Sequence, residues 1–224
     1  MRKTWKWQSG VSLDPARLAR DLVVLGGIAL NVLLSLLNQA LGLPLYLDTI
    51  GTIVVALVCD PLAAIGTALI SSIICIPVSR IAIYFSIVNV CIAISASRMI
   101  CRNVFRKKGG WIIFALTLSL LCGVLGGLIA WSLNTIISVN FVSIPYLDRI
   151  IDGSKTGRFF TLMLMNLLLN LVDKFISVPV AMFIVHLVPS RIREMIRNIH
   201  NQDDVERLDM SRRHRRMGAA AYSL

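Results

Sequence analysis

Long apolar runs, separated by short charged, proline- or glycine-containing breaks, follow one another along most of the chain. The first run covers residues 22–41, and its 20 residues would extend about 30 Å as a helix, the thickness of one bilayer core. It is too long for the core of a signal peptide and lacks a convincing cleavage site, so the pattern predicts a retained helix. Comparable helices are predicted over 81–97, 111–136 and 159–188.

Two shorter apolar runs, 45–59 and 62–76, lie between the first and second long runs and are separated by Asp60 and Pro61. About 15 residues are too few for a full span, so these runs are either two short tilted helices or a re-entrant hairpin. Both alternatives return the chain to the same side of the membrane. We therefore expect an all-α integral membrane protein with six membrane segments, the second and third of them short.

Basic residues are concentrated on one set of connecting segments. The chain has 23 Lys and Arg against 12 Asp and Glu, a formal charge of +11. In a soluble protein this excess would indicate nucleic-acid binding, but here the basic residues flank apolar segments. With both termini inside, 18 basic residues fall on inner segments and four on outer ones. The positive-inside rule thus predicts cytoplasmic termini.

The same pattern divides the chain into three parts. Residues 1–20 form a basic cytoplasmic N-terminus, residues 21–189 a six-helix membrane domain, and residues 190–224 a basic cytoplasmic tail. The tail is expected to begin with an amphipathic helix over 190–209, with isoleucines on one side. Its basic end is interpreted as an anchor near anionic lipid of the bilayer, with a protein or nucleic-acid contact as the alternative.

Composition excludes most soluble classes of protein. Hydrophobic residues make up 56% of the chain and charged residues only 16%, against about a quarter in soluble domains. The cysteines lie in or beside apolar runs without a CxxC pair, and the three histidines are isolated, so we expect no metal site and no cofactor. The cysteines are Cys59, Cys75, Cys91, Cys101 and Cys122.

Polar side chains inside the sixth apolar run follow one helix face. Asn166, Asn170, Asp173 and Ser177 are spaced i, i+4, i+7 and i+11, and Lys174 borders the same stripe. A charged side chain at the centre of a membrane helix costs about 2.5–3.5 kcal/mol, so such residues usually face a bundle interior or an aqueous cavity. The stripe therefore predicts either interhelical contacts around a neutralised Asp–Lys pair or a ligand pocket with a switchable charge pair.

Other segments carry polar or aromatic residues that can meet this stripe. The first has Asn31, Ser35 and Asn38 on one face, and Asp48 with Thr49 opens the second, where they can also serve as a helix N-cap. Aromatic rings that stack on a flat ligand and amides that bond its edge are typical of small-molecule sites. The candidate ligand-binding residues are Asp48, Tyr84, Asn89, Trp131, Asn134, Asn166, Asn170, Asp173 and Lys174.

Small residues indicate where helices approach closely. Gly123 and Gly127 form a GxxxG pair in the fifth run, for which helix packing is the default interpretation. Catalytic motifs are missing from the sequence: it has no Walker A, HExxH or GxSxG pattern and no membrane phosphotransferase carboxylate motif. We expect no enzymatic activity, and any ATP hydrolysis has to come from separate subunits.

Three stretches carry a family resemblance. They read LPLYLDTIGTIVVA at 43–56, PLAAIG at 61–66 and NLVDKFIS at 170–177. Together with the six segments and cytoplasmic ends, they resemble the substrate-binding S component of energy-coupling factor (ECF) transporters, over about residues 20–190. In that family an Ala-xxx-Ala pair for docking often lies on the first helix. Here Ala64 and Ala68 provide that spacing on the third segment, so they are candidates for packing or docking.

The resemblance implies a function in uptake. Such a protein sits in the cell membrane of a prokaryote and captures a vitamin or similar micronutrient from outside. It docks on a transmembrane coupling subunit driven by two cytosolic ATPase subunits, and it is thought to topple in the membrane as it carries its ligand inward. Two alternatives stay open: a membrane sensor or interaction module without transport, and a self-standing secondary transporter.

Overall fold

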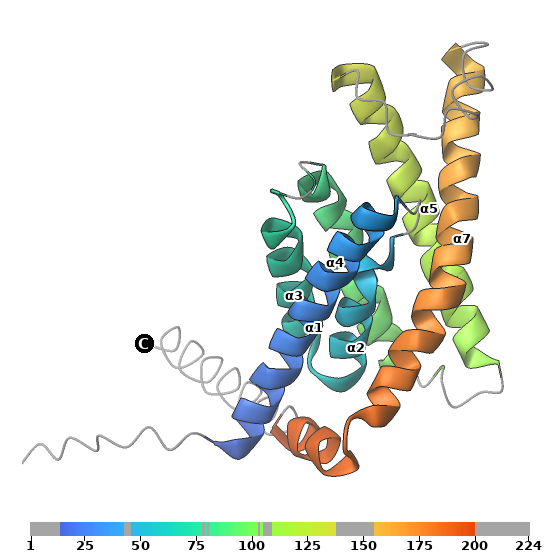
Figure 1. The fold of residues 1–224 in the computed structure, drawn as a ribbon. Coiled ribbons are helices and arrows are strands. Elements are labelled where there is room, and N and C mark those ends of the chain that lie inside the picture. Colours follow the sequence, from blue (N-terminus) through green and yellow to red (C-terminus); the bar gives the residue numbers. More distant parts are fainter. Residues whose placement is uncertain are drawn as a thin grey trace, which may run out of the picture.

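A computed structural model describes the chain at residues 14–42, 46–77, 79, 81–102, 104, 109–137 and 155–199. All regular elements within these ranges are helical, as the apolar runs predict. Four helices are long and apolar enough to cross a membrane. These are α1 (Pro15–Leu41), α4 (Ala82–Cys101), α5 (Gly110–Ile137) and α7 (Lys155–Leu187) (Figure 1). Large apolar side chains are exposed along their outer faces, as in a protein surrounded by lipid.

The first helix begins earlier than predicted. Asp14 accepts a hydrogen bond from the Ala16 backbone N–H at 3.1 Å, and Pro15 occupies the first helical position, so the start is capped. Residues 15–20, assigned above to the N-terminal segment, therefore belong to α1. The hydropathy pattern leaves these residues outside the helix because this first turn and a half carries charged side chains. The helix ends at Gly42, which has a φ of 61° that glycine adopts without strain.

The two short apolar runs form short helices. A 3-10 turn, η1 (Leu47–Thr49), leads into α2 (Ile50–Val58), and α3 (Pro61–Ile74) follows after Asp60. The nine residues of α2 extend only about 14 Å, so this helix cannot span a bilayer alone. It lies inside the bundle instead, in contact with α1, α3, α4 and α7.

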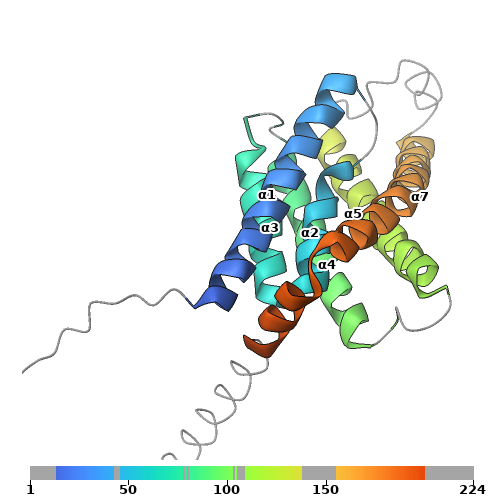
Figure 2. The same cartoon turned by 60° about the horizontal axis from the view of Figure 1, so that its bottom comes forward.

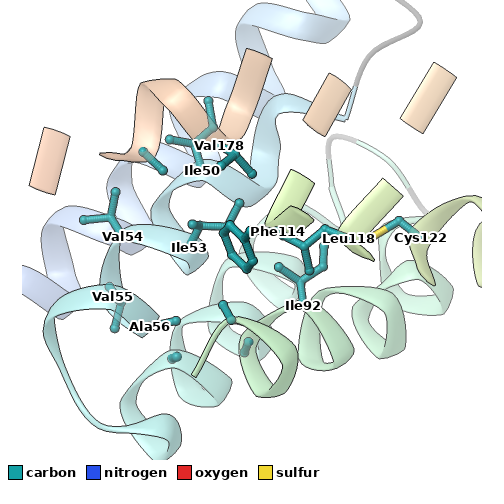
Figure 3. Packing of buried hydrophobic residues seen from close by; sticks show 14 of the residues in the cluster. Ile50, Ile53, Val54, Val55, Ala56, Ile92, Phe114, Leu118, Cys122 and Val178 are labelled. Carbon is teal, nitrogen blue, oxygen red and sulfur yellow. The ribbon is translucent and has the colours of Figure 1, made fainter. Parts of the chain in front are cut away.

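The apolar core is built around α2. Ile50, Ile53 and Val54 of this helix meet Ile92 of α4, Phe114 and Leu118 of α5, and Val178 of α7 (Figure 3). Every residue from Ile50 to Ala56 is buried, because α2 is apolar on all sides and has a helix on each of them. Lipid tails are as apolar as these side chains, so close packing rather than escape from water holds this core together.

Helices α5 and α7 pack closely through glycine. A Cβ added at Gly123 would lie 2.8 Å from the Cα of Leu167, and one at Gly127 would lie 2.6 Å from the sulfur of Met163. Both residues of the GxxxG pair thus lie against α7. The backbones of α5 and α7 can approach this closely because glycine has no side chain.

The two ends of the bundle differ in chemistry. The start of α1, the ends of α4 and α7 and a helix at 190–199 lie at one end, which we call the basic end (Figures 1 and 2). Ile196 and Ile199 are buried on the helix at 190–199 while Arg191 and Arg197 are exposed, so the described half of the predicted amphipathic helix is present. The end of α1 and η1 lie at the opposite end, called the η1 end. The segments 1–13, 138–154 and 200–224 lie outside the described residues.

Candidate functional site

A small cavity brings together polar residues from three elements toward the η1 end. Four of the nine candidate residues line it: Asp48 of η1, Asn89 of α4, and Asn170 and Lys174 of α7. They are far apart in sequence, so their meeting is a product of the fold. The remaining wall is formed by Tyr46, Phe85, Val88, Cys122 and Gly126.

Lys174 is the centre of a buried hydrogen-bond network behind this cavity. Its ammonium donates to the carboxylate of Asp173 at 2.6 Å and to the hydroxyl of Thr49 at 2.8 Å. Asp173 also accepts from the backbone N–H of Tyr46 at 3.1 Å and from the hydroxyl of Ser177 at 3.4 Å. The network ties α7 to the segment that precedes α2.

Burial makes this network energetically decisive. Lys174 and Asp173 each have 0% of their surface exposed. Removing two charges from water is costly, and the cost is recovered only when the pair is close and its other hydrogen-bonding positions are filled. The hydroxyls of Thr49 and Ser177 and the N–H of Tyr46 provide that completion.

The segment around Asp48 does not cap α2. The N-cap position of this helix is Thr49, whose side chain makes no capping bond. Its hydroxyl accepts from Lys174 and lies 3.4 Å from the Tyr46 carbonyl oxygen, to which it donates. The N-cap interpretation of Asp48 and Thr49 is therefore wrong, because Lys174 takes the hydroxyl that would have capped the helix. Asp48 instead is one of the residues that line the cavity.

The buried amides differ in their partners. Asn89 donates to the hydroxyl of Ser72 at 3.2 Å, and Asn170 donates to the carbonyl of Asn166 one turn earlier. Asn166 donates to the Leu162 carbonyl, but its Oδ1 is buried without a hydrogen-bond partner among the described residues. That oxygen lies 3.5 Å from where a Cβ on Gly126, a cavity-lining residue, would be. An acceptor is thus left free beside the cavity.

Two aromatic candidates lie elsewhere. Tyr84 is 45% exposed and does not line the cavity, and Trp131 is 38% exposed and packs edge-on against Phe159. The cavity's aromatic wall is instead Tyr46 and Phe85, whose rings stack with centroids 6.0 Å apart. Asn134 belongs to α5, but its side chain lies outside the described part of the chain.

The sequence carried a signal for Phe85 but none for Tyr46. Phe85 precedes Asn89 by four residues and therefore shares its helix face, whereas Tyr84 is five residues away and turns outward. Tyr46 contributes its ring and its backbone N–H from a connecting segment, where no side-chain periodicity can predict either contact.

Asn31, the best-connected polar residue of α1, is structural. Its amide donates to Thr52 at 2.9 Å and to Ser71 at 3.3 Å, and its oxygen accepts from the Gly51 N–H at 2.7 Å. One side chain thereby joins α1, α2 and α3. All its bonds are made within the bundle, so it is not available to a ligand.

The alanine pair is also internal. Ala64 and Ala68 both have 0% of their surface exposed on α3, which packs against α1, α2 and α4. Their spacing serves helix packing inside the chain. As a docking surface for another subunit the pair is ruled out in this conformation, because its side chains already contact the neighbouring helices.

The cavity combines charged, polar and aromatic groups. Its lining holds one cation, one carboxylate, two amides and two stacked rings, and no group of three metal-ligating side chains occurs within the described ranges. The cavity holds about 30 Å³, room for one or two water molecules, whereas small-molecule sites usually enclose about 300–1,000 Å³. A vitamin-sized molecule therefore requires the walls to move apart. Comparison with protein families, curated proteins and solved structures finds no match.

Proposed function

We propose that this chain is the membrane-embedded capture subunit of an ATP-driven importer for a small, vitamin-type micronutrient. The observation that carries the proposal is the convergence of Asp48, Asn89, Asn170 and Lys174 on one cavity inside an otherwise apolar bundle. Polar groups in such a bundle are costly and mark ligand or ion sites by default. The resemblance to ECF S components supports the same function.

The proposed topology has six membrane segments, four long and two short, with both termini in the cytoplasm of a prokaryotic cell. The basic end then faces the cytoplasm, as the positive-inside rule requires. The cavity lies toward the η1 end, so in this orientation it lies nearer the outer surface. A ligand would enter from the outer surface.

Ligand entry would begin at the aromatic wall. Tyr46 precedes η1 and Phe85 lies in the second turn of α4, so separating these two stacked rings would open the cavity toward the η1 end. The rings would then stack on a flat ligand while Asn89 and Asn170 bond its polar edge. The free acceptor of Asn166 would receive a ligand N–H or O–H group.

Energy for transport would come from other chains. The sequence has no Walker A motif, and the proposal assigns ATP hydrolysis to two cytosolic ATPase subunits joined through a transmembrane coupling subunit. Because Ala64 and Ala68 are buried, the proposed docking surface uses other, outward-facing helix surfaces.

Native mass spectrometry of the protein purified in mild detergent, with identification of released small molecules, tests this function. We expect a co-purified compound of vitamin size. Asn170→Ala removes an amide and Asp48→Asn removes a negative charge, so each should weaken binding of this compound at least tenfold. Tyr84→Phe and Trp131→Phe are matched controls outside the cavity and should retain it.

Other outcomes would favour other functions. An empty protein that purifies without ATPase subunits would contradict the proposal and favour a sensor or interaction module. Uptake that persists in cells lacking every ATPase partner would favour a secondary transporter. Retention of the compound in Asn170→Ala and Asp48→Asn would place the ligand somewhere other than this cavity.

A further inference from the structure

A second, larger cavity lies at the basic end. It encloses about 630 Å³ between the ends of α2, α4 and α7 and the helix at 190–199. Apolar side chains such as Val58, Ile100 and Val185 form the wall toward the bundle. The helix at 190–199 forms the opposite wall and adds Arg193 and Arg197. The cavity thus combines an apolar side with a cationic one.

Arg193 carries an unsatisfied donor. Its Nε is buried and has no hydrogen-bond partner among the described residues, although a buried guanidinium N–H normally requires an acceptor. Arg197 follows four residues later, on the same helix face, and lines the same cavity. Two guanidinium groups one turn apart are well suited to bind the oxygens of a phosphate group.

The charges at the cavity are mixed. Glu194 also lines it, and Asp60, beside the lining residues Cys59 and Pro61, has a buried oxygen without a partner in the described chain. Arg193 and Arg197 are the cationic side chains of the lining. Further positive charge lies at exposed positions outside the lining, on Arg98, Arg102 and Arg191.

We propose that this basic-end cavity binds the headgroup of an anionic phospholipid, with the phosphate at Arg193 and Arg197 and the glycerol end along the apolar wall. The position favours a lipid over a soluble anion. The cavity lies where α4 and α7 end, at the expected depth of headgroups, and the helix at 190–199 has the buried isoleucines and outward arginines of an interfacial helix. The proposal is independent of nutrient capture.

Lipid titration in native mass spectrometry tests the assignment, using phosphatidylglycerol as the anionic probe and phosphatidylcholine as the zwitterionic one. The double variant Arg193→Gln with Arg197→Gln should bind phosphatidylglycerol about 30-fold more weakly, because two arginines near an anionic headgroup are removed. The matched control, Arg98→Gln with Arg191→Gln, removes the same charge from positions that do not line the cavity and should change binding by less than about threefold.

A variant that keeps every charge tests whether weaker lipid binding comes from the loss of the site rather than from misfolding. Ile100→Trp fills the apolar side and should also weaken phosphatidylglycerol binding, with helical content unchanged by circular dichroism. Equal affinity for the two lipids would overturn the proposal, as would equal losses in the two double variants or unchanged binding in Ile100→Trp. Full displacement of the lipid by millimolar inorganic phosphate would identify the ligand as a free anion and overturn the lipid assignment.

Discussion

At the scale of single residues, Lys174 and Asp173 are adjacent in sequence and still form an ion pair. Consecutive residues on a helix point about 100° apart and normally do not face each other. The long lysine side chain bends back to Asp173 at 2.6 Å and reaches Thr49 on the other side. The pair therefore works as a clamp between α7 and η1, as the interhelical interpretation predicts, and the ligand-pocket interpretation stays a prediction.

Removing one partner of this pair should strongly destabilise the fold. We expect Lys174→Met to lower the free energy of unfolding by about 3–5 kcal/mol, because Asp173 is left as an unpaired buried charge. Adding Asp173→Leu to Lys174→Met should recover most of that loss. Unfolding in mixed detergent micelles measures both variants, and simple additivity of the two single losses would contradict the clamp.

Residue-level prediction succeeded where periodicity carried the information. The stripe Asn170, Asp173 and Ser177 does lie on the inner face of α7, and all three are buried. Tyr84 and Trp131 do not line the cavity, because the sequence argument for them rests on chemistry rather than on helix phase. No pattern in the sequence shows that the backbone N–H of Tyr46 donates a hydrogen bond to Asp173.

At the scale of elements, α2 is held at its first turn by backbone contact with α1. A Cβ at Gly51 would collide with the carbonyl oxygen of Gly27, and the Gly51 N–H donates to Asn31. Length and apolarity predicted a short membrane segment here. They did not predict that this segment is enclosed by the longer helices, because enclosure depends on how those helices pack.

Gly51→Ala should separate α1 from α2. The added methyl has no space, so we expect a loss of about 1–3 kcal/mol in stability and partial loss of the Asn31 hydrogen bonds. Gly66→Ala is the matched control, because nothing lies within 4 Å of a Cβ there and alanine is the better helix former. Thermal unfolding in detergent compares them. Equal melting temperatures for the two variants would contradict this account of the contact.

At the scale of the whole molecule, the two cavities lie toward opposite ends of the bundle. Charge counting predicts which end faces the cytoplasm, and the fold places the start of α1 and the end of α7 at the same end of the bundle (Figure 1). The two cavities could not be predicted from the sequence, since hydropathy does not show where helices leave space between them. Both are lined by residues from at least three separate elements.

Cysteine labelling in intact cells tests the orientation. In a background with the other native cysteines replaced by alanine, Ala40→Cys near the end of α1 should react with a membrane-impermeant maleimide from outside. Cys101, exposed at the basic end, should react only after permeabilisation. The reversed pattern would place the basic end outside and contradict the proposed direction of capture.

The burial of α2 has a consequence for how the protein is made. This helix leaves the ribosome before α4 and α7, two of the four helices that it contacts. With nine residues it cannot rest stably across the membrane while it waits for them. The packing around α2 is therefore incomplete until α7 is inserted. A product truncated before Lys174 would leave α2 without this part of its packing, and membrane quality-control proteases should remove it quickly.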